Sequence, residues 1–147
     1  MKDLPVQVFR YNPAVDEKPY LQVFQVRVHE GARVLHVLHA IHDEHDPSLF
    51  YRYCCASGQC GSCAVRVNGE PVLACMEEAR DGIIIEPLEL PVKRDLVVDM
   101  EPYLVAISSL EPGEEFRMPT PEEVEVIKPL RSCIECLACV SACPALK

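Results

Sequence analysis

The sequence predicts an α+β fold, with a sheet domain over residues 1–100 followed by the start of a helical domain over residues 101–147. The first part alternates apolar and polar residues over several short runs, which is the pattern of half-buried strands. Residues 32–44 instead repeat their apolar side chains with the period of a helix. The second part is punctuated by prolines, which limit helices to short segments.

The composition is that of a globular protein that does not bind nucleic acid. Of the 147 residues, 49% are hydrophobic, enough for a core, and the net charge is −9. Phosphate binding needs a cationic face, so this acidic balance argues against a nucleic-acid partner. No apolar run approaches the roughly 18 residues that a membrane span needs.

The chain opens with a predicted β-hairpin. Residues 5–11 and 20–28 both alternate apolar and polar side chains, and residues 12–19 between them are turn-forming. The helix predicted next has an apolar stripe and ends at Asp46-Pro47. The stripe consists of Val34, Val37, Leu38 and Ile41, with Leu35 at its edge.

Histidines recur every third residue along this helix, at positions 36, 39, 42 and 45. A step of three residues turns the side chain back by about 60 degrees, so the four imidazoles spiral around the helix. One pair three residues apart could contact a metal. We expect solvated or flanking histidines instead.

Four cysteines after the helix have the spacing of an iron-sulfur site. Cys55, Cys60, Cys63 and Cys75 read C-x4-C-x2-C-x11-C, the plant-type pattern for a 2Fe-2S cluster. Gly58 and Gly61 allow the backbone to turn tightly between the first three.

The fourth cysteine returns to the loop through a second predicted hairpin. Residues 64–67 and 70–74 flank Asn68-Gly69, a strong hairpin signal, so the hairpin brings Cys75 back beside the loop. Residues 82–87 read as a buried strand. Two strands, a helix, the cysteine loop, a hairpin and a strand together predict a ferredoxin-like β-grasp arrangement.

Cys54 does not fit the spacing, and we expect it to be a spare buried thiol. A zinc knot or a disulfide framework is the alternative for this stretch, but structural zinc sites use two short cysteine pairs that are well separated. Residues 1–10 show no export or transit signal. We therefore expect a reducing compartment, where clustered cysteines indicate metal or redox chemistry.

Residues 88–132 predict short helices. Pro102 cannot sit inside one straight helix, so we expect two short helices or a kinked one over residues 96–107. Thr120, Pro121 and Glu123 supply an N-cap, a first-turn proline and a capping-box carboxylate. The helix that they start is expected to stop before Pro129.

A second cysteine run closes the chain. Cys133, Cys136, Cys139 and Cys143 read C-x2-C-x2-C-x3-C-P, in which the first three bind one 4Fe-4S cluster and the fourth normally binds another. The fourth ligand of the 4Fe-4S cluster is therefore not identified. The chain could be a fragment, another subunit could supply the ligand, or Cys143 could close the same cluster. Zinc or unligated thiols are the alternative for the whole run.

With both runs in place, the chain resembles the iron-sulfur subunit of the succinate dehydrogenase and fumarate reductase family. The resemblance spans nearly the whole sequence in one order. It rests on residues 9–13, 46–49, 51–55, 60–63, 68–69, 73–75, 93–100 and the closing cysteine run.

The resemblance implies an electron-transfer subunit without substrate chemistry of its own. Its β-grasp domain would hold a 2Fe-2S cluster on Cys55, Cys60, Cys63 and Cys75, and its α-helical domain would hold a 4Fe-4S cluster with Cys133, Cys136 and Cys139. Cys143 would be the first ligand of a 3Fe-4S cluster, which needs further ligands from outside this chain.

The partners implied are a FAD-bearing catalytic subunit and a membrane-anchor or other electron-accepting subunit that carries a quinone site. The chain would then be cytoplasmic and peripheral on the cytoplasmic membrane. Related reductases pass electrons to thiol-disulfide modules instead, and the residues present do not distinguish the two acceptors. A stand-alone two-cluster ferredoxin and a structural zinc protein are the rival classes.

Overall fold

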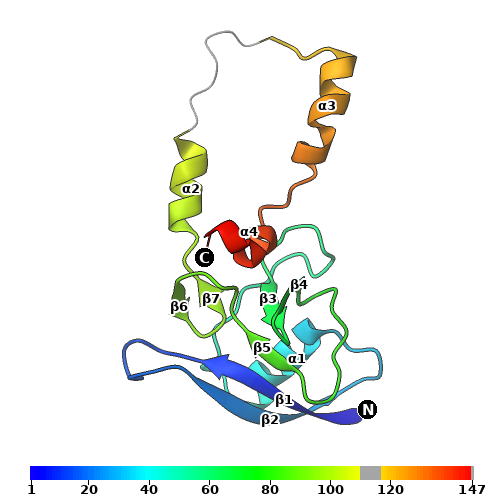
Figure 1. Ribbon diagram of the computed structural model, residues 1–147. Coiled ribbons are helices and arrows are strands. Elements are labelled where there is room, and N and C mark those ends of the chain that lie inside the picture. The colour runs from blue at the N-terminus through cyan, green and yellow to red at the C-terminus, as the bar shows by residue number, and fades with distance from the viewer. Residues whose placement is uncertain (110–116, 147) are drawn as a thin grey trace.

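The computed structural model describes residues 1–109 and 117–146. Its main body is a five-stranded mixed sheet in the order β2-β1-β5-β3-β4, with helix α1 against it (Figure 1). The elements are β1 (Lys2–Arg10), β2 (Tyr20–Val28), α1 (Val34–Ala40), β3 (Ala64–Val67), β4 (Glu70–Leu73) and β5 (Ile84–Glu86). This arrangement confirms the predicted order of strands, helix, loop, hairpin and strand.

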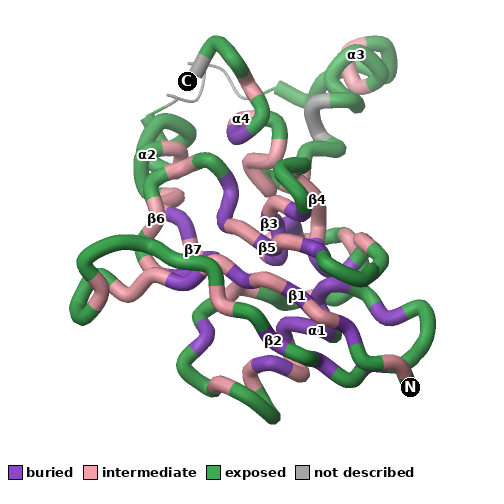
Figure 2. The backbone as a smooth tube through the Cα atoms, turned by 60° about the horizontal axis from the view of Figure 1, so that its bottom comes forward, coloured by how far each residue is buried: buried purple, intermediate pink, exposed green. Residues whose placement is uncertain are grey.

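The opening hairpin is paired along its whole length. β1 and β2 run antiparallel from the pair Lys2 and Val28 to the pair Arg10 and Tyr20, and β5 lies parallel on the other side of β1. Alternate side chains of both strands are buried, as their period predicts. They meet the predicted stripe of α1, and both sets belong to one core cluster. Figure 2 colours the buried positions of these elements along the backbone.

Helix α1 continues as a short π-helix over Ile41–His45. The amide of Asp46 donates to the carbonyl of Ile41, five residues back, at 2.7 Å. The helical segment therefore ends at Asp46-Pro47, as predicted. The stripe residues from Val34 to Ile41 are fully buried or nearly so.

The second hairpin turns at the predicted residues. Asn68 and Gly69 both have positive φ, of 52° and 88°, which is the requirement of a type I′ turn. The side-chain oxygen of Asn68 also accepts a hydrogen bond from the Ile84 amide at 2.9 Å. Asn68 thus fixes the turn of one hairpin against the start of β5.

The expectation of helical structure from residue 96 is wrong at its start. Residues 97–98 form strand β7 (Val97–Val98), which pairs with β6 (Val92–Arg94) in a separate two-stranded sheet. Helix α2 begins only at Glu101 and ends at Ser108. Pro102 lies in its first turn, where the missing amide costs no helical hydrogen bond, so no kink is needed.

The third helix starts as predicted and ends later. α3 covers Pro121–Arg131, and Thr120 and Glu123 form the expected reciprocal capping bonds of 2.9 and 3.3 Å. The prediction that it stops before Pro129 is wrong. Pro129 removes a single hydrogen bond close to the helix end, and the helix stops two residues later.

The last segment returns to the sheet domain. α2 and α3 extend away from the sheets, and α2 buries none of its residues (Figure 1). The short helix α4 (Ala138–Ala142) and a 3-10 turn over Pro144–Leu146 lie back against the body of the molecule. The closing cysteine run is therefore placed beside the first domain.

A buried ion pair fastens the segment that leads into the first cysteine loop. The Arg10 guanidinium donates to Asp95 at 3.0 Å, and only 1% of Asp95 is exposed. The Asp95 carboxylate also accepts the amides of Tyr11 and Phe50, both at 2.9 Å. One carboxylate thus joins β1, the β6-β7 turn and residue 50.

The same guanidinium also contacts Asp46 and Ser48 in the segment that follows the π-helix. The Ser48 hydroxyl, and after it the Arg10 guanidinium, lower the pKa of Asp46 to about 2 against the opposing effect of burial. Sequence patterns did not reveal this network, although its members stand in three of the stretches that carry the family resemblance.

We predict that Asp95→Ala lowers the free energy of unfolding by about 3–5 kcal/mol, because it removes the more deeply buried of the two carboxylates on Arg10 and leaves the amides of Tyr11 and Phe50 without their acceptor. Chemical denaturation of the full chain would measure the change.

Asp3→Ala is the matched control, because Asp3 pairs with Arg27 on the surface, where both side chains are more than half exposed. This substitution should leave stability almost unchanged. An equal effect of the two substitutions would contradict the role given to Asp95.

Candidate metal centre

The first cysteine loop and the hairpin that follows it place four cysteines as neighbours in pairs, Cys55 beside Cys60 and Cys63 beside Cys75. Cys55, Cys60 and Cys63 precede β3, and Cys75 follows β4. The Ala74 amide donates to the Cys63 carbonyl at 3.0 Å, which holds the return of the hairpin against the loop. The hairpin therefore delivers Cys75 beside Cys63, as the sequence predicted.

Backbone amides surround the Cys55 sulfur. The amides of Ser57, Gln59 and Cys60 lie 3.4, 3.3 and 3.3 Å from it. These amides, with that of Ser57 foremost, lower the pKa of the Cys55 thiol to about 6. These amides therefore stabilise the thiolate form of Cys55.

The other half of the set is buried against the core. Cys63 is 4% and Cys75 is 7% exposed, and both belong to the main core cluster. Burial raises the pKa of Cys63 to about 11. In this environment the Cys63 thiolate needs the positive charge of a bound metal to be stable, since burial disfavours an isolated charge.

The backbone of the loop takes the turns that its glycines predicted. Gly58 and Gly61 have φ of +75° and +68°, and Ala56 between the first two cysteines also has positive φ. These turns direct successive amides toward sulfur. The site offers four thiols as donors, with amides directed at the sulfur of Cys55 and with Cys63 and Cys75 shielded from water. These donors fit the thiolate ligation of an iron-sulfur cluster.

Cys54 lies outside this set. It is exposed, so the expectation of a buried spare thiol is wrong in that respect. Neighbouring positions on the extended chain before the loop point in different directions. The side chain of Cys54 therefore turns to solvent while that of Cys55 turns toward the loop amides.

The second cysteine run forms a tight turn followed by α4. Glu135 and Leu137 both have positive φ, of 54° and 62°, so the chain reverses between Cys133 and Cys139. Cys136 and Cys143 are half-buried, whereas Cys133 and Cys139 are exposed. Over residues 1–109 and 117–146, which include both cysteine runs, no three Cys, His, Asp or Glu side chains are grouped as a single metal ion would require.

The second run is docked on the first domain. Cys136 and Leu137 pack against a small core of Ala64, Leu88 and Val98. Ser141 is 3% exposed, and its hydroxyl accepts a hydrogen bond from the Glu89 amide at 2.8 Å. The structure therefore places the two cysteine runs side by side, which the sequence did not predict.

The histidines of the α1 segment flank other side chains, as expected. The Tyr51 hydroxyl lies 2.8 Å from Nδ1 of His39, and the Tyr53 ring meets the same imidazole edge to face. His36 and His45 are exposed. This aromatic group stands just before the cysteine loop, and a search for pairs of Tyr and His close to the loop could have suggested it.

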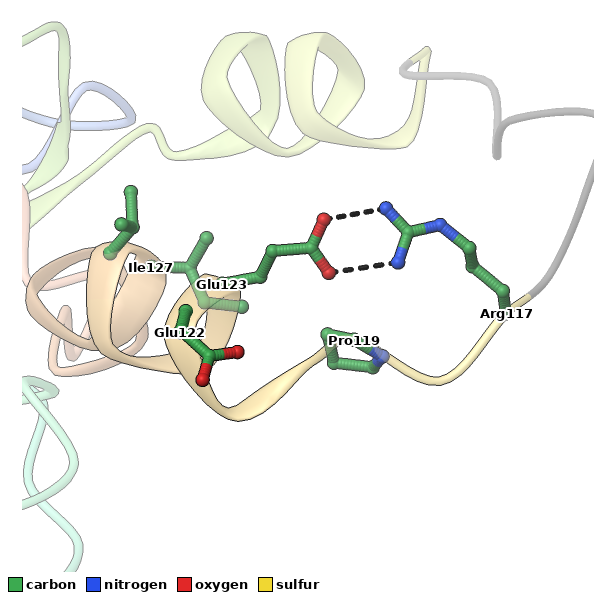
Figure 3. A pocket seen from close by; sticks show the side chains of 6 residues that line it. Arg117, Pro119, Glu122, Glu123 and Ile127 are labelled. Atoms are coloured by element: carbon green, nitrogen blue, oxygen red, sulfur yellow. Dashed lines mark hydrogen bonds and ion pairs between the residues drawn. The ribbon is translucent and has the colours of Figure 1, made fainter.

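A pocket of about 550 Å³ lies at the start of α3, apart from the cysteines (Figure 3). In this pocket the Arg117 guanidinium donates two hydrogen bonds, of 2.8 and 2.6 Å, to the Glu123 carboxylate. The ion pair reinforces the capping of α3. None of the pocket-lining residues is a cysteine.

Comparison with known proteins identifies the family. The family described as "2Fe-2S iron-sulfur cluster binding domain" matches residues 5–105. The chain belongs to the iron-sulfur subunit family of succinate dehydrogenases and fumarate reductases. The predicted family resemblance is confirmed, and so is its 2Fe-2S domain.

Two curated relatives show how much of a longer protein the chain matches. A subunit of the fumarate reductase (CoM/CoB) of Methanothermobacter marburgensis is 42% identical over 97% of the chain, which spans 30% of that relative. The fumarate reductase iron-sulfur subunit of Haemophilus influenzae is 34% identical over 95% of the chain, which spans 64% of that relative.

A solved structure has the same fold. The Mycobacterium smegmatis Sdh1 complex in the apo form matches with a TM-score of 0.79 and 33% identity, over 96% of this chain and 63% of that one. The chain thus spans between about a third and two thirds of the length of these relatives. Over the described ranges, no helix is long and apolar enough to cross a membrane.

We predict that Cys60→Ala abolishes the 2Fe-2S absorbance and the paramagnetic resonance signal of the reduced protein, whereas Cys54→Ala retains both. Cys60 lies in the amide-lined loop and Cys54 faces solvent. Because cluster binding is coupled to folding, Cys60→Ala should also destabilise the first domain. Loss of the signal in Cys54→Ala would refute the assignment of ligands.

Proposed function

We propose that this chain is the electron-transfer part of a succinate dehydrogenase or fumarate reductase type complex. The observation that carries the proposal is the juxtaposition of two cysteine runs with different cluster spacings on one small domain. A chain that only needed a structural metal would have no reason to place a second run against the first. A chain that passes electrons needs such proximity.

The residues proposed to hold the groups follow the two runs. Cys55, Cys60, Cys63 and Cys75 would hold a 2Fe-2S cluster, and Cys133, Cys136 and Cys139 would contribute to a 4Fe-4S cluster. Cys143, half-buried at the end of α4, would serve a 3Fe-4S or 4Fe-4S cluster with ligands from outside these 147 residues. When bound, such clusters supply single-electron carriers whose potentials depend on hydrogen bonding and solvent access.

The protein's own contribution is to set the environment of each sulfur. Amides of residues 57, 59 and 60 stabilise charge on Cys55, while the core removes water from Cys63 and Cys75. One side of the first site is therefore polar and open and the other is dry. We infer that electrons enter or leave through the open side and that substrate chemistry takes place on a partner.

The partners proposed are a FAD-bearing catalytic subunit and an electron-accepting subunit at the cytoplasmic membrane. Two acceptor classes fit the family, a membrane quinone site and a thiol-disulfide module. The 42% identity with a subunit of a fumarate reductase (CoM/CoB) favours the thiol-linked class. The iron-sulfur subunits of the other relatives support the general electron-transfer role equally.

The proposal predicts that the chain is needed for coupled turnover and not for the flavin chemistry itself. In the complex purified with its partner subunits, Cys60→Ala should abolish electron passage to the natural acceptor. It should leave the activity measured with a dye that reacts directly with the flavin subunit. Steady-state assays measure the activity with the natural acceptor and the activity with the dye separately. Cys54→Ala is the matched control.

Equal loss of both activities in Cys60→Ala would contradict a relay role. Migration of the chain as a lone monomer that copurifies with no flavin subunit would favour the stand-alone ferredoxin. Stoichiometric zinc in a colourless preparation would favour the structural zinc protein.

A further inference from the structure

Gly61 is the point at which the two cysteine loops touch. It is buried between Cys60 and Cys63, with φ of +68°. A Cβ atom at this position would lie 2.7 Å from the Ile134 carbonyl oxygen and 2.8 Å from Cβ of Cys136. Both distances are shorter than real Cβ contacts, so the second loop approaches as closely as it does only because residue 61 has no side chain.

The second loop is held against this point at its turn and again after it. Cys136 and Leu137 pack on the small core formed by Ala64, Leu88 and Val98. After the turn, the Ser141 hydroxyl accepts the Glu89 amide. A side chain at residue 61 would therefore meet backbone that is anchored, and the loop could yield only by giving up this packing.

We propose that Gly61 sets the closest approach of the two cysteine loops and is a positioning residue for electron transfer between the clusters that they hold. This inference rests on the proposed function. With both clusters bound, the step would pass one electron from the reduced donor cluster, which would be oxidised, to the oxidised acceptor cluster, which would be reduced. The flavin-bearing partner supplies or removes electrons, and no bond forms or breaks. Because electron tunnelling weakens steeply with distance, displacement of one loop slows this step.

The first loop contains its own matched control. Gly58 also has positive φ, of +75°, but a Cβ there would meet only the Met76 side chain, at 3.0 Å from its sulfur. That flexible side chain can move aside. Alanine at either position is strained by a left-handed backbone. Only Gly61→Ala also presses against the backbone of the second run.

The first test measures the contact and needs no bound cluster. The reduced, cluster-free full chain is treated with iodoacetamide, and modification of each cysteine is followed by peptide mass mapping. Exposed Cys133 is the internal reference for half-buried Cys136. We expect Gly61→Ala to raise the rate at which Cys136 is modified, relative to that of Cys133, several-fold. Gly58→Ala should leave this ratio of modification rates unchanged. Buried Cys63 and Cys75 should stay protected if the fold is intact.

A second variant approaches the same contact from the other side. Ser141→Ala removes the hydroxyl that fastens α4 to Glu89 and leaves the first loop untouched. It should also raise the modification rate of Cys136 relative to that of Cys133. This variant keeps the inference testable if Gly61→Ala fails to fold. The inference is overturned if Cys136 stays as protected in both variants as it is in Gly58→Ala.

The second test uses the complex with its clusters in place. Gly61→Ala should retain the 2Fe-2S resonance signal, while rapid freeze-quench kinetics should show electron passage between the two sites slowed several-fold relative to Gly58→Ala. An unchanged rate in a fully loaded variant overturns the positioning role. Absence of clusters from the unmodified protein would instead overturn the proposed function, so the two failures are distinguishable.

Discussion

The carboxylate of Asp95 is the constraint on which the placement of both cysteine runs depends. It pairs with the buried Arg10 and accepts the amide of Phe50, which fixes the chain that leads into the first loop. The residue Asp95 itself lies in the turn between β6 and β7, where its backbone φ is +46°. Val98 of β7 belongs to the small core on which Cys136 and Leu137 pack. A single buried interaction therefore connects the start of the sheet, the first loop and the seat of the second run.

The four cysteines of the first site lie in two different environments. Hydrogen bonds from loop amides stabilise charge on Cys55, whereas burial disfavours it on Cys63. A bound cluster reconciles the two environments, because it needs thiolates on both sides and supplies the positive charge that the dry side lacks. The turn of the second run lies directly against Gly61. In the proposed relay, the same contacts would therefore serve both fold stability and electron passage between the two runs.

Local patterns predicted most of the first domain and none of its long-range polar contacts. Periodicity located β1, β2 and the α1 stripe, and Asn68-Gly69 fixed a hairpin, because these features depend on neighbouring residues. Residues 97–98 were misassigned because a two-residue strand has no period, and α3 continues for two residues past Pro129 despite the hydrogen bond that the missing amide removes. The cysteine spacings identified the candidate ligands. The Arg10 and Asp95 pair, 85 residues apart in sequence, and the contact of Gly61 with Ile134 follow from tertiary packing, which no short motif encodes.

The most direct test of the account is the content of iron and acid-labile sulfide per chain in anaerobically purified protein, combined with paramagnetic resonance after reduction. A 2Fe-2S site on the first run gives at least roughly two irons and two sulfides with a 2Fe-2S signal, rising to roughly six of each where the second run holds a complete 4Fe-4S cluster. Protein without labile sulfide that carries zinc in place of iron would contradict it.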